Sequence, residues 1–106
     1  MNCSRNDVVL LPIPFSDLTS TKVRPAIVVG HGSSSGDLLV VPVTSRMAQG
    51  DFSLKQRKTC GLHVPSAVKG QLATIDSRLV RKVVGRLAKS DIQTLDGRLR
   101  TWLDLR

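Results

Sequence analysis

The sequence predicts a mainly β domain with a C-terminal helix, in which the strands form a small antiparallel barrel or a strongly bent sheet. Three observations support this fold class. The chain has 106 residues, which is enough for one hydrophobic core but not for two. Five short apolar segments with turn-forming residues between them precede Ser77. From Ser90 onward, the apolar residues change to a helical spacing. We therefore treat residues 1–106 as a single domain.

The first three predicted strands have the clearest patterns. Residues 7–15 are apolar and rich in β-branched side chains. Pro12 and Pro14 cannot donate to a sheet ladder, so they place the second half of this strand at an edge. Residues 24–30 and 37–45 are continuous apolar runs joined by the turn-forming sequence HGSSSG. These two runs predict a β-hairpin.

The later elements have weaker patterns, except for the last one. Residues 51–56 alternate like a half-exposed strand, and residues 63–76 have the composition of one more strand. Residues 77–87 fit a helix or a strand equally well. In the C-terminal segment, Ser90 and Gln93 have the form of a capping box, and the predicted apolar face consists of Ile92, Leu95, Leu99 and Trp102 or Leu103. This spacing predicts an amphipathic helix, although Gly97 inside it costs about 1 kcal/mol.

The composition limits the classes of function. Sixteen Lys and Arg residues against eight aspartates give a net charge of +8, which attracts polyanions. Nucleic acid, an acidic protein or an anionic membrane surface would fit this charge, and so would a merely soluble basic surface. Cys3 and Cys60 predict two reduced thiols. The sequence has neither a membrane-spanning apolar run nor a signal peptide, so we expect a cytoplasmic protein without a membrane partner.

Three further motifs each have a chemical and a simpler interpretation. GSSSG at residues 32–36 matches a nucleophile elbow, but a strand follows it instead of a helix, which favours a hairpin loop. Cys60 and His63 have half the spacing of a zinc site without a second pair, so we predict no metal and no other cofactor. A basic cluster is either a solvated face or a surface that binds phosphate or a partner: Arg78, Arg81, Lys82, Arg86 and Lys89.

The main candidate site lies where the predicted hairpin begins and ends. Arg24 precedes Pro25, which restricts the arginine backbone to an extended conformation and so orients its guanidinium. Thr44, Ser45 and Arg46 end the second strand, near Arg24 if the two strands pair. A hydroxyl-rich loop precedes Arg24 and contains Asp17, Thr19, Ser20, Thr21 and Lys22. These side chains suit a phosphodiester, whereas the simpler alternative is a positively charged hairpin end with local hydrogen bonds.

With these residues in view, the sequence resembles the MazF/PemK family of toxins from bacterial toxin–antitoxin systems. The resemblance covers nearly the whole chain in four segments: NDVVLLPIPFSDLTSTKVRPAIVV, LVVPVTS, ATID and VGRLAKSDIQTL. It implies an SH3-like antiparallel β-barrel with a C-terminal helix, a homodimer, and a strand at residues 83–87.

The resemblance also implies a function. Proteins of this family cleave single-stranded RNA or mRNA at short sequences without a metal, leaving a 2′,3′-cyclic phosphate and a 5′-hydroxyl. An acidic antitoxin would occupy the RNA groove, and promoter DNA is a further partner through the antitoxin complex. Two alternatives remain, namely a non-catalytic nucleic-acid-binding or interaction module on the same fold, and a gyrase-directed toxin.

Residue roles follow from the same resemblance. Arg24 matches the catalytic arginine of the family, and Thr44 with Ser45 matches its Thr-Ser pair. The loop before Arg24 lacks the Glu and Gln of many relatives, so Asp17 is our candidate for the general base. We expect these residues to contact RNA: Thr19, Thr21, Lys22, Arg46, Lys55, Lys69 and Gln71.

Overall fold

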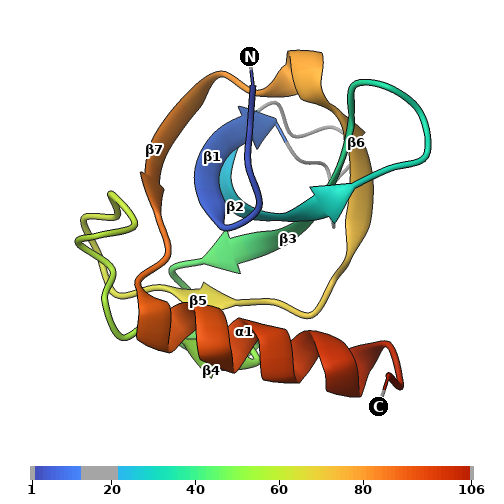
Figure 1. Cartoon of the computed structure of the whole chain (residues 1–106). Coiled ribbons are helices and arrows are strands. Elements are labelled where there is room, and N and C mark those ends of the chain that lie inside the picture. The colour runs from blue at the N-terminus through green and yellow to red at the C-terminus, as the bar shows by residue number, and fades with distance from the viewer. Residues whose placement is uncertain (1, 13–21, 106) are drawn as a thin grey trace.

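The computed structural model describes residues 2–12 and 22–105. They form one antiparallel sheet with a helix beside it (Figure 1). The strands are β1 (Asp7–Pro12), β2 (Val23–His31), β3 (Asp37–Thr44), β4 (Phe52–Ser53), β5 (Ala67–Val68), β6 (Ala73–Asp76) and β7 (Lys82–Arg86). The helices are α1 (Lys89–Trp102) and two short 3-10 turns, η1 (Met47–Gln49) and η2 (Ser77–Leu79). No helix in the described part of the chain is long and apolar enough to cross a membrane.

The sheet is bent but not closed. Its strand order is β4-β5-β3-β2-β1-β7, with β6 paired to the other half of β3. The terminal strands β4 and β7 do not pair with each other within residues 2–12 and 22–105. Register shifts in the β1–β7 and β2–β3 pairings add twist and curvature. The predicted mainly β fold with a C-terminal helix is therefore confirmed, in the form of a strongly bent sheet rather than a closed barrel.

The predicted strand at residues 63–76 is divided in two. β5 pairs with the end of β3, at Val43 and Thr44, whereas β6 pairs with its beginning, from Asp37 to Val40. The chain between them leaves the ladder to pass from one half of β3 to the other. The ambiguous segment that follows forms η2 and then β7, which confirms the strand that the resemblance implied.

The outer edge of β7 is covered by the loop at residues 57–62. The backbone amide of Arg86 donates to the carbonyl of Thr59 at 3.2 Å. A Cβ placed on Gly85 would lie 2.6 Å from that carbonyl oxygen, so this close approach requires glycine. The contact protects an edge strand from pairing with another chain.

Two hydrophobic clusters use alternate residues of β2 and β3. Ile27 and Val41 belong to the cluster that includes Leu95 and Leu99 of α1. Val28 and Val40 belong to the cluster on the other face of the sheet. This alternation is the two-residue period of a strand with both faces buried.

The helix α1 packs as predicted but begins differently. Ile92, Leu95, Leu99 and Trp102 all contact the first cluster, which confirms the predicted apolar face. The N-cap is Ala88, without a side-chain cap, so the predicted Ser90–Gln93 capping box is wrong. Ser90 lies inside the first turn because the amide of Ile92 already donates to the carbonyl of Ala88.

The first turn of α1 is anchored by a buried carboxylate instead. Asp91 is 1% exposed, and its two oxygens accept hydrogen bonds from the backbone amides of Lys55 and Gln56 at 2.9 and 3.0 Å. A carboxylate at the N-terminus of a helix is also favoured by the helix dipole. This contact ties α1 to the segment that follows β4.

Candidate functional site

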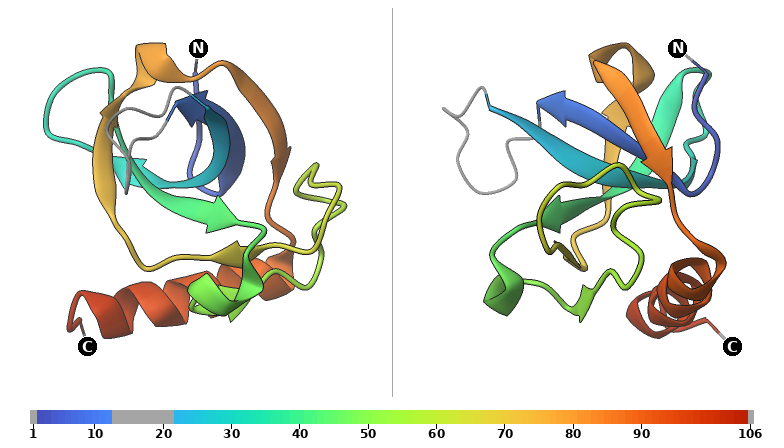
Figure 2. Two further views of the ribbon diagram at one scale, coloured as in Figure 1. Left: turned by 180° about the vertical axis from the view of Figure 1, so that it is seen from behind. Right: turned by 90° about the vertical axis from the view of Figure 1, so that its left-hand side faces the viewer.

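Arg24 and Thr44 lie at the same end of the β2–β3 hairpin. Toward this end of the hairpin, Ala26 and Pro42 are the last two residues that pair with each other. Arg24 lies two residues before Ala26, and Thr44 lies two residues after Pro42. Residues two apart in a strand share a face, so Arg24 and Thr44 are on the same face as that pair. Figure 2 shows the start of β2 and the end of β3 on one side of the molecule, away from α1, which is seen end-on in the right-hand view.

Arg24 is held by its backbone and exposed at its side chain. It lies in β2, opposite the buried Leu11 of β1, which confirms the extended conformation expected of the residue before Pro25. Its guanidinium makes no hydrogen bond or ion pair with any residue that the structure describes. Its five donors are therefore available to an anion.

Thr44 presents an oriented hydroxyl. Its Oγ1 accepts a hydrogen bond from the backbone amide of Arg46 at 3.0 Å, and its backbone pairs with Ala67 of β5. A hydroxyl that accepts one bond keeps its own hydrogen to donate. Thr44 is therefore suited to donate to an oxygen of a bound anion.

Lys69 lies on the same face as these residues. Its amide donates to the carbonyl of Pro42 at 2.9 Å, and the β3–β5 register that pairs Val43 with Val68 puts Lys69 opposite Pro42. Ser45 and Arg46 follow Thr44 directly and are exposed. The end of the hairpin thus combines Arg24 and Thr44 with two further cations.

Other predicted contact residues lie elsewhere or outside the described residues. The amide of Lys55 is held by Asp91 at the start of α1, so the structure does not join Lys55 to Arg24. Gln71 is exposed and follows Gly70, which packs against Trp102 near the end of α1. Lys22 is exposed just before β2. Asp17, Thr19 and Thr21 lie outside the described residues.

Sequence reasoning did not identify Asp51. Its Oδ2 accepts the amide of Gly70 at 2.5 Å, and its own amide donates to the carbonyl of Val68. These two hydrogen bonds hold the backbone directly before and directly after Lys69. No local pattern in the sequence indicates a contact between segments so far apart.

The alternative motifs do not form a reactive site. The GSSSG segment connects β2 to β3, so it is a hairpin loop rather than a nucleophile elbow. Burial, and then the charge of Asp91, raise the pKa of the Cys60 thiol to about 11, which keeps it protonated. His63 is exposed, and the described residues contain no group of three metal-binding side chains.

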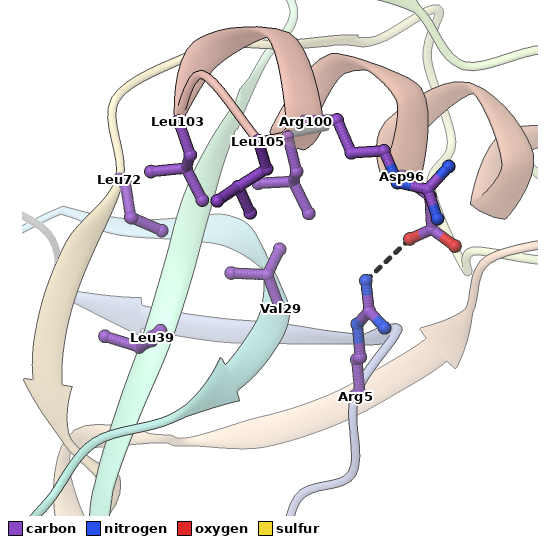
Figure 3. Close-up of a pocket in the computed structure, with 9 residues that line it drawn as sticks. Arg5, Val29, Leu39, Leu72, Asp96, Arg100, Leu103 and Leu105 are labelled. Carbon is purple, nitrogen blue, oxygen red and sulfur yellow. Dashed lines mark hydrogen bonds and ion pairs between the residues drawn. The ribbon is translucent and has the colours of Figure 1, made fainter.

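A cavity of about 270 Å³ lies away from this hairpin end (Figure 3). Its apolar lining includes Val29, Leu39, Leu72, Leu103 and Leu105, and the Arg5–Asp96 ion pair of 2.6 Å lies at its side. Arg24 and Thr44 do not line it. Among the described residues of the candidate site, Arg24, Ser45 and Arg46 are exposed and Thr44 is half-buried, so these side chains are accessible to an extended polymer.

The comparisons with known proteins place this bent antiparallel sheet with a C-terminal helix in a class of small protein toxins. The family described as PemK-like, MazF-like toxin of type II toxin–antitoxin system matches residues 4–103. The chain belongs to this family, which confirms the resemblance found in the sequence. No curated protein matches the chain.

Solved structures share the fold at low sequence identity. The Mycobacterium tuberculosis toxin MazF-mt6 is 18% identical with a TM-score of 0.72, over 94% of this chain and 98% of that one. MazF in the MazE–MazF structure from Deinococcus radiodurans is 20% identical with a TM-score of 0.75, over 98% of each chain. An endoribonuclease in complex with its cognate antitoxin, from a mycobacterial species, is 16% identical with a TM-score of 0.68, over 100% of this chain and 98% of that one.

Proposed function

We propose that this toxin is a metal-independent endoribonuclease that cleaves single-stranded RNA or mRNA at a short sequence. The observation that carries the proposal is the placement of Arg24 and Thr44 on one face at the open end of the β2–β3 hairpin. A similar structure described as an endoribonuclease supports the same activity. The positive charge of the chain suits an RNA substrate.

In the proposed reaction, the ribose 2′-hydroxyl attacks its own phosphate. A bond forms between the 2′-oxygen and phosphorus, and the bond from phosphorus to the 5′-oxygen breaks. The products are a 2′,3′-cyclic phosphate and a 5′-hydroxyl. The proton of the 2′-hydroxyl passes to a base, for which we propose Asp17, and the departing 5′-oxygen takes a proton from Arg24.

The described residues suit the charge that develops in this reaction. The exposed guanidinium of Arg24 can hold the phosphorane oxygens through two parallel hydrogen bonds. The Thr44 hydroxyl, oriented by the amide of Arg46, donates to another oxygen, with Ser45 beside it. Lys22, Arg46 and Lys69 contact the RNA backbone on either side. Groups fixed in strands before the substrate arrives cost little reorganisation.

We also propose three protein or nucleic-acid partners. A cognate acidic antitoxin would bind the basic hairpin end and block RNA, consistent with the antitoxin complexes among the similar structures. The exposed leucines beside the cavity, Leu72, Leu103 and Leu105, supply an apolar surface for a homodimer. Promoter DNA would be bound through the antitoxin complex.

The test is cleavage of a long single-stranded RNA by the purified protein in EDTA. We expect defined fragments with cyclic phosphate ends from the wild type, and loss of cleavage by about 10²-fold or more in Arg24→Ala. Arg78→Ala is the matched control, because it removes the same charge from a guanidinium paired with Asp76. Intact RNA that is retarded on a gel would instead support a non-catalytic binder. Inhibition of DNA supercoiling without RNA cleavage would support a gyrase-directed toxin.

A further inference from the structure

We propose that Arg81 and Lys82, at the start of β7, bind RNA phosphates beside the one that is cleaved. The inference rests on the proposed function and extends its site across β1. Neither residue belongs to the hairpin that carries Arg24 and Thr44. Both belong to the basic cluster whose role the sequence left open.

The structure divides that cluster into paired and unpaired cations. Arg78 is paired with Asp76 at 2.7 Å, and Arg86 is paired with Asp7 at 3.0 Å. Arg81, Lys82 and Lys89 are exposed, and their side chains form no ion pair or hydrogen bond with the residues that the structure describes. Lys89 begins α1, whereas Arg81 and Lys82 lie at the start of β7. The charges of Arg81 and Lys82 are therefore not compensated locally, and these two are the unpaired cations of the cluster that lie beside β1.

The two unpaired cations lie across β1 from Arg24. The amide of Arg81 donates to the carbonyl of Leu10 at 2.8 Å, and Lys82 is paired with Leu10 along the strands. On the other side of β1, the next residue, Leu11, is paired with Arg24. In the right-hand view of Figure 2, the start of β7 lies beside the end of β1.

Strand pairing sets the distance between the backbones at Arg24 and at Arg81. Neighbouring strands are about 4.8 Å apart, so the backbones at Arg24 and Arg81 are separated by two such spacings, on the order of 10 Å. Arg81 continues the row of Leu11 and Arg24, so it starts on the face of Arg24. Lys82 is paired with Leu10 and starts on the other face, from which its long side chain reaches the same RNA strand around the edge of β7. A single RNA strand whose scissile phosphate is held by Arg24 can therefore place a neighbouring phosphate against the start of β7.

The test is the salt dependence of RNA binding. The probe is a fluorescent 2′-O-methyl RNA oligonucleotide, which has no free 2′-hydroxyl and cannot be cleaved by this reaction. Its Kd is measured by anisotropy across salt concentrations for the wild type and for the double variant R81A/K82A. Each phosphate contact on a single strand contributes about 0.7 to the slope of log affinity against log salt. We expect the double variant to lose a slope of about 1.4.

Two control variants and a melting measurement show whether an effect comes from charge, from location or from a folding defect. Arg78→Ala removes one charge that is already paired, and we expect its slope to stay close to that of the wild type. The variant R81K/K82R keeps both charges and should retain the wild-type slope. Thermal unfolding of each variant establishes that the exposed substitutions leave the fold intact.

The outcomes distinguish this inference from the proposed function. If the wild type cleaves RNA in EDTA but R81A/K82A binds the probe with the wild-type slope, the inference is overturned and the endoribonuclease remains. If the wild type neither cleaves RNA nor binds the probe, both are overturned. In cleavage assays, the inference requires R81A/K82A to raise KM several-fold while kcat stays unchanged, because these residues hold phosphates that do not react.

Discussion

Arg24 lies two residues before Ala26 in β2, and Thr44 lies two residues after Pro42 in β3. Ala26 and Pro42 are the last paired residues at this end of the β2–β3 hairpin. One residue contributes an exposed cation, and the other contributes a hydroxyl whose acceptor side is already occupied. Both backbones are held in strands, so the two side chains start from fixed positions before any substrate binds. Fixed starting positions of this kind would favour the proposed reaction, because charge-stabilising groups then reorganise less.

Replacing Thr44 tests the role of its hydroxyl. Thr44→Val keeps the shape and removes both the acceptor for the Arg46 amide and the donor to the phosphate. We expect kcat/KM for RNA cleavage to fall by about 10²-fold, because a lost donor to a developing oxyanion has this effect. Thr44→Ser keeps the oxygen and should remain within a few-fold of the wild type. Equal activity of the wild type and Thr44→Val would exclude the proposed role.

Replacing Asp91 tests the anchor of α1. In Asp91→Asn, one of the two oxygens that accept the amides of Lys55 and Gln56 is replaced by an NH₂ group. We expect the free energy of unfolding in urea to fall by about 1–3 kcal/mol, since a buried amide loses its partner. Asp104→Asn is the control, because Asp104 is exposed at the end of the helix. A wild-type urea midpoint for Asp91→Asn would show that the contact contributes nothing to stability.

The glycines of α1 and β7 should respond oppositely to alanine. A Cβ at Gly97 would meet no atom within 4 Å, so Gly97→Ala should stabilise the protein by about 0.5–1 kcal/mol through helix propensity. A Cβ at Gly85 would lie 2.5 Å from the carbonyl carbon of Cys60, so Gly85→Ala should lower the midpoint of thermal unfolding. The two variants are compared in one melting experiment. Destabilisation by Gly97→Ala would contradict the exposed position of that residue in the helix.

The pKa of Asp76 should depend on Arg78. Hydrogen bonds from the Arg78 side chain and backbone lower this pKa from 3.8 to about 2. A carboxyl with a depressed pKa contributes stability above its unfolded pKa of 3.8, and that contribution is lost as the pH falls toward 2. Carboxyl NMR titration should give a midpoint near 2 in the wild type and a higher one in Arg78→Ala. Arg100→Ala, far from Asp76, should leave the midpoint unchanged.

Local sequence patterns determined the hairpin, the apolar face of α1 and the residues that meet at the hairpin end. The apolar run at residues 24–30 became most of β2, because a strand with both faces buried needs no distant information to be recognised. Pro25 fixed the conformation of Arg24 for an equally local reason. The family resemblance, confirmed over residues 4–103, added the functional interpretation of these residues.

Only the tertiary structure decided the features that depend on distant partners. The segment 63–76 forms two strands instead of the one predicted, because β5 and β6 pair with different halves of β3. Asp91, rather than Ser90, anchors the start of α1 because amides from the segment after β4 reach its carboxylate. Arg81 was one of five similar cations in the sequence, and its place across β1 from Arg24 follows from strand pairing. Such contacts join residues far apart along the chain, and local periodicity carries no information about them.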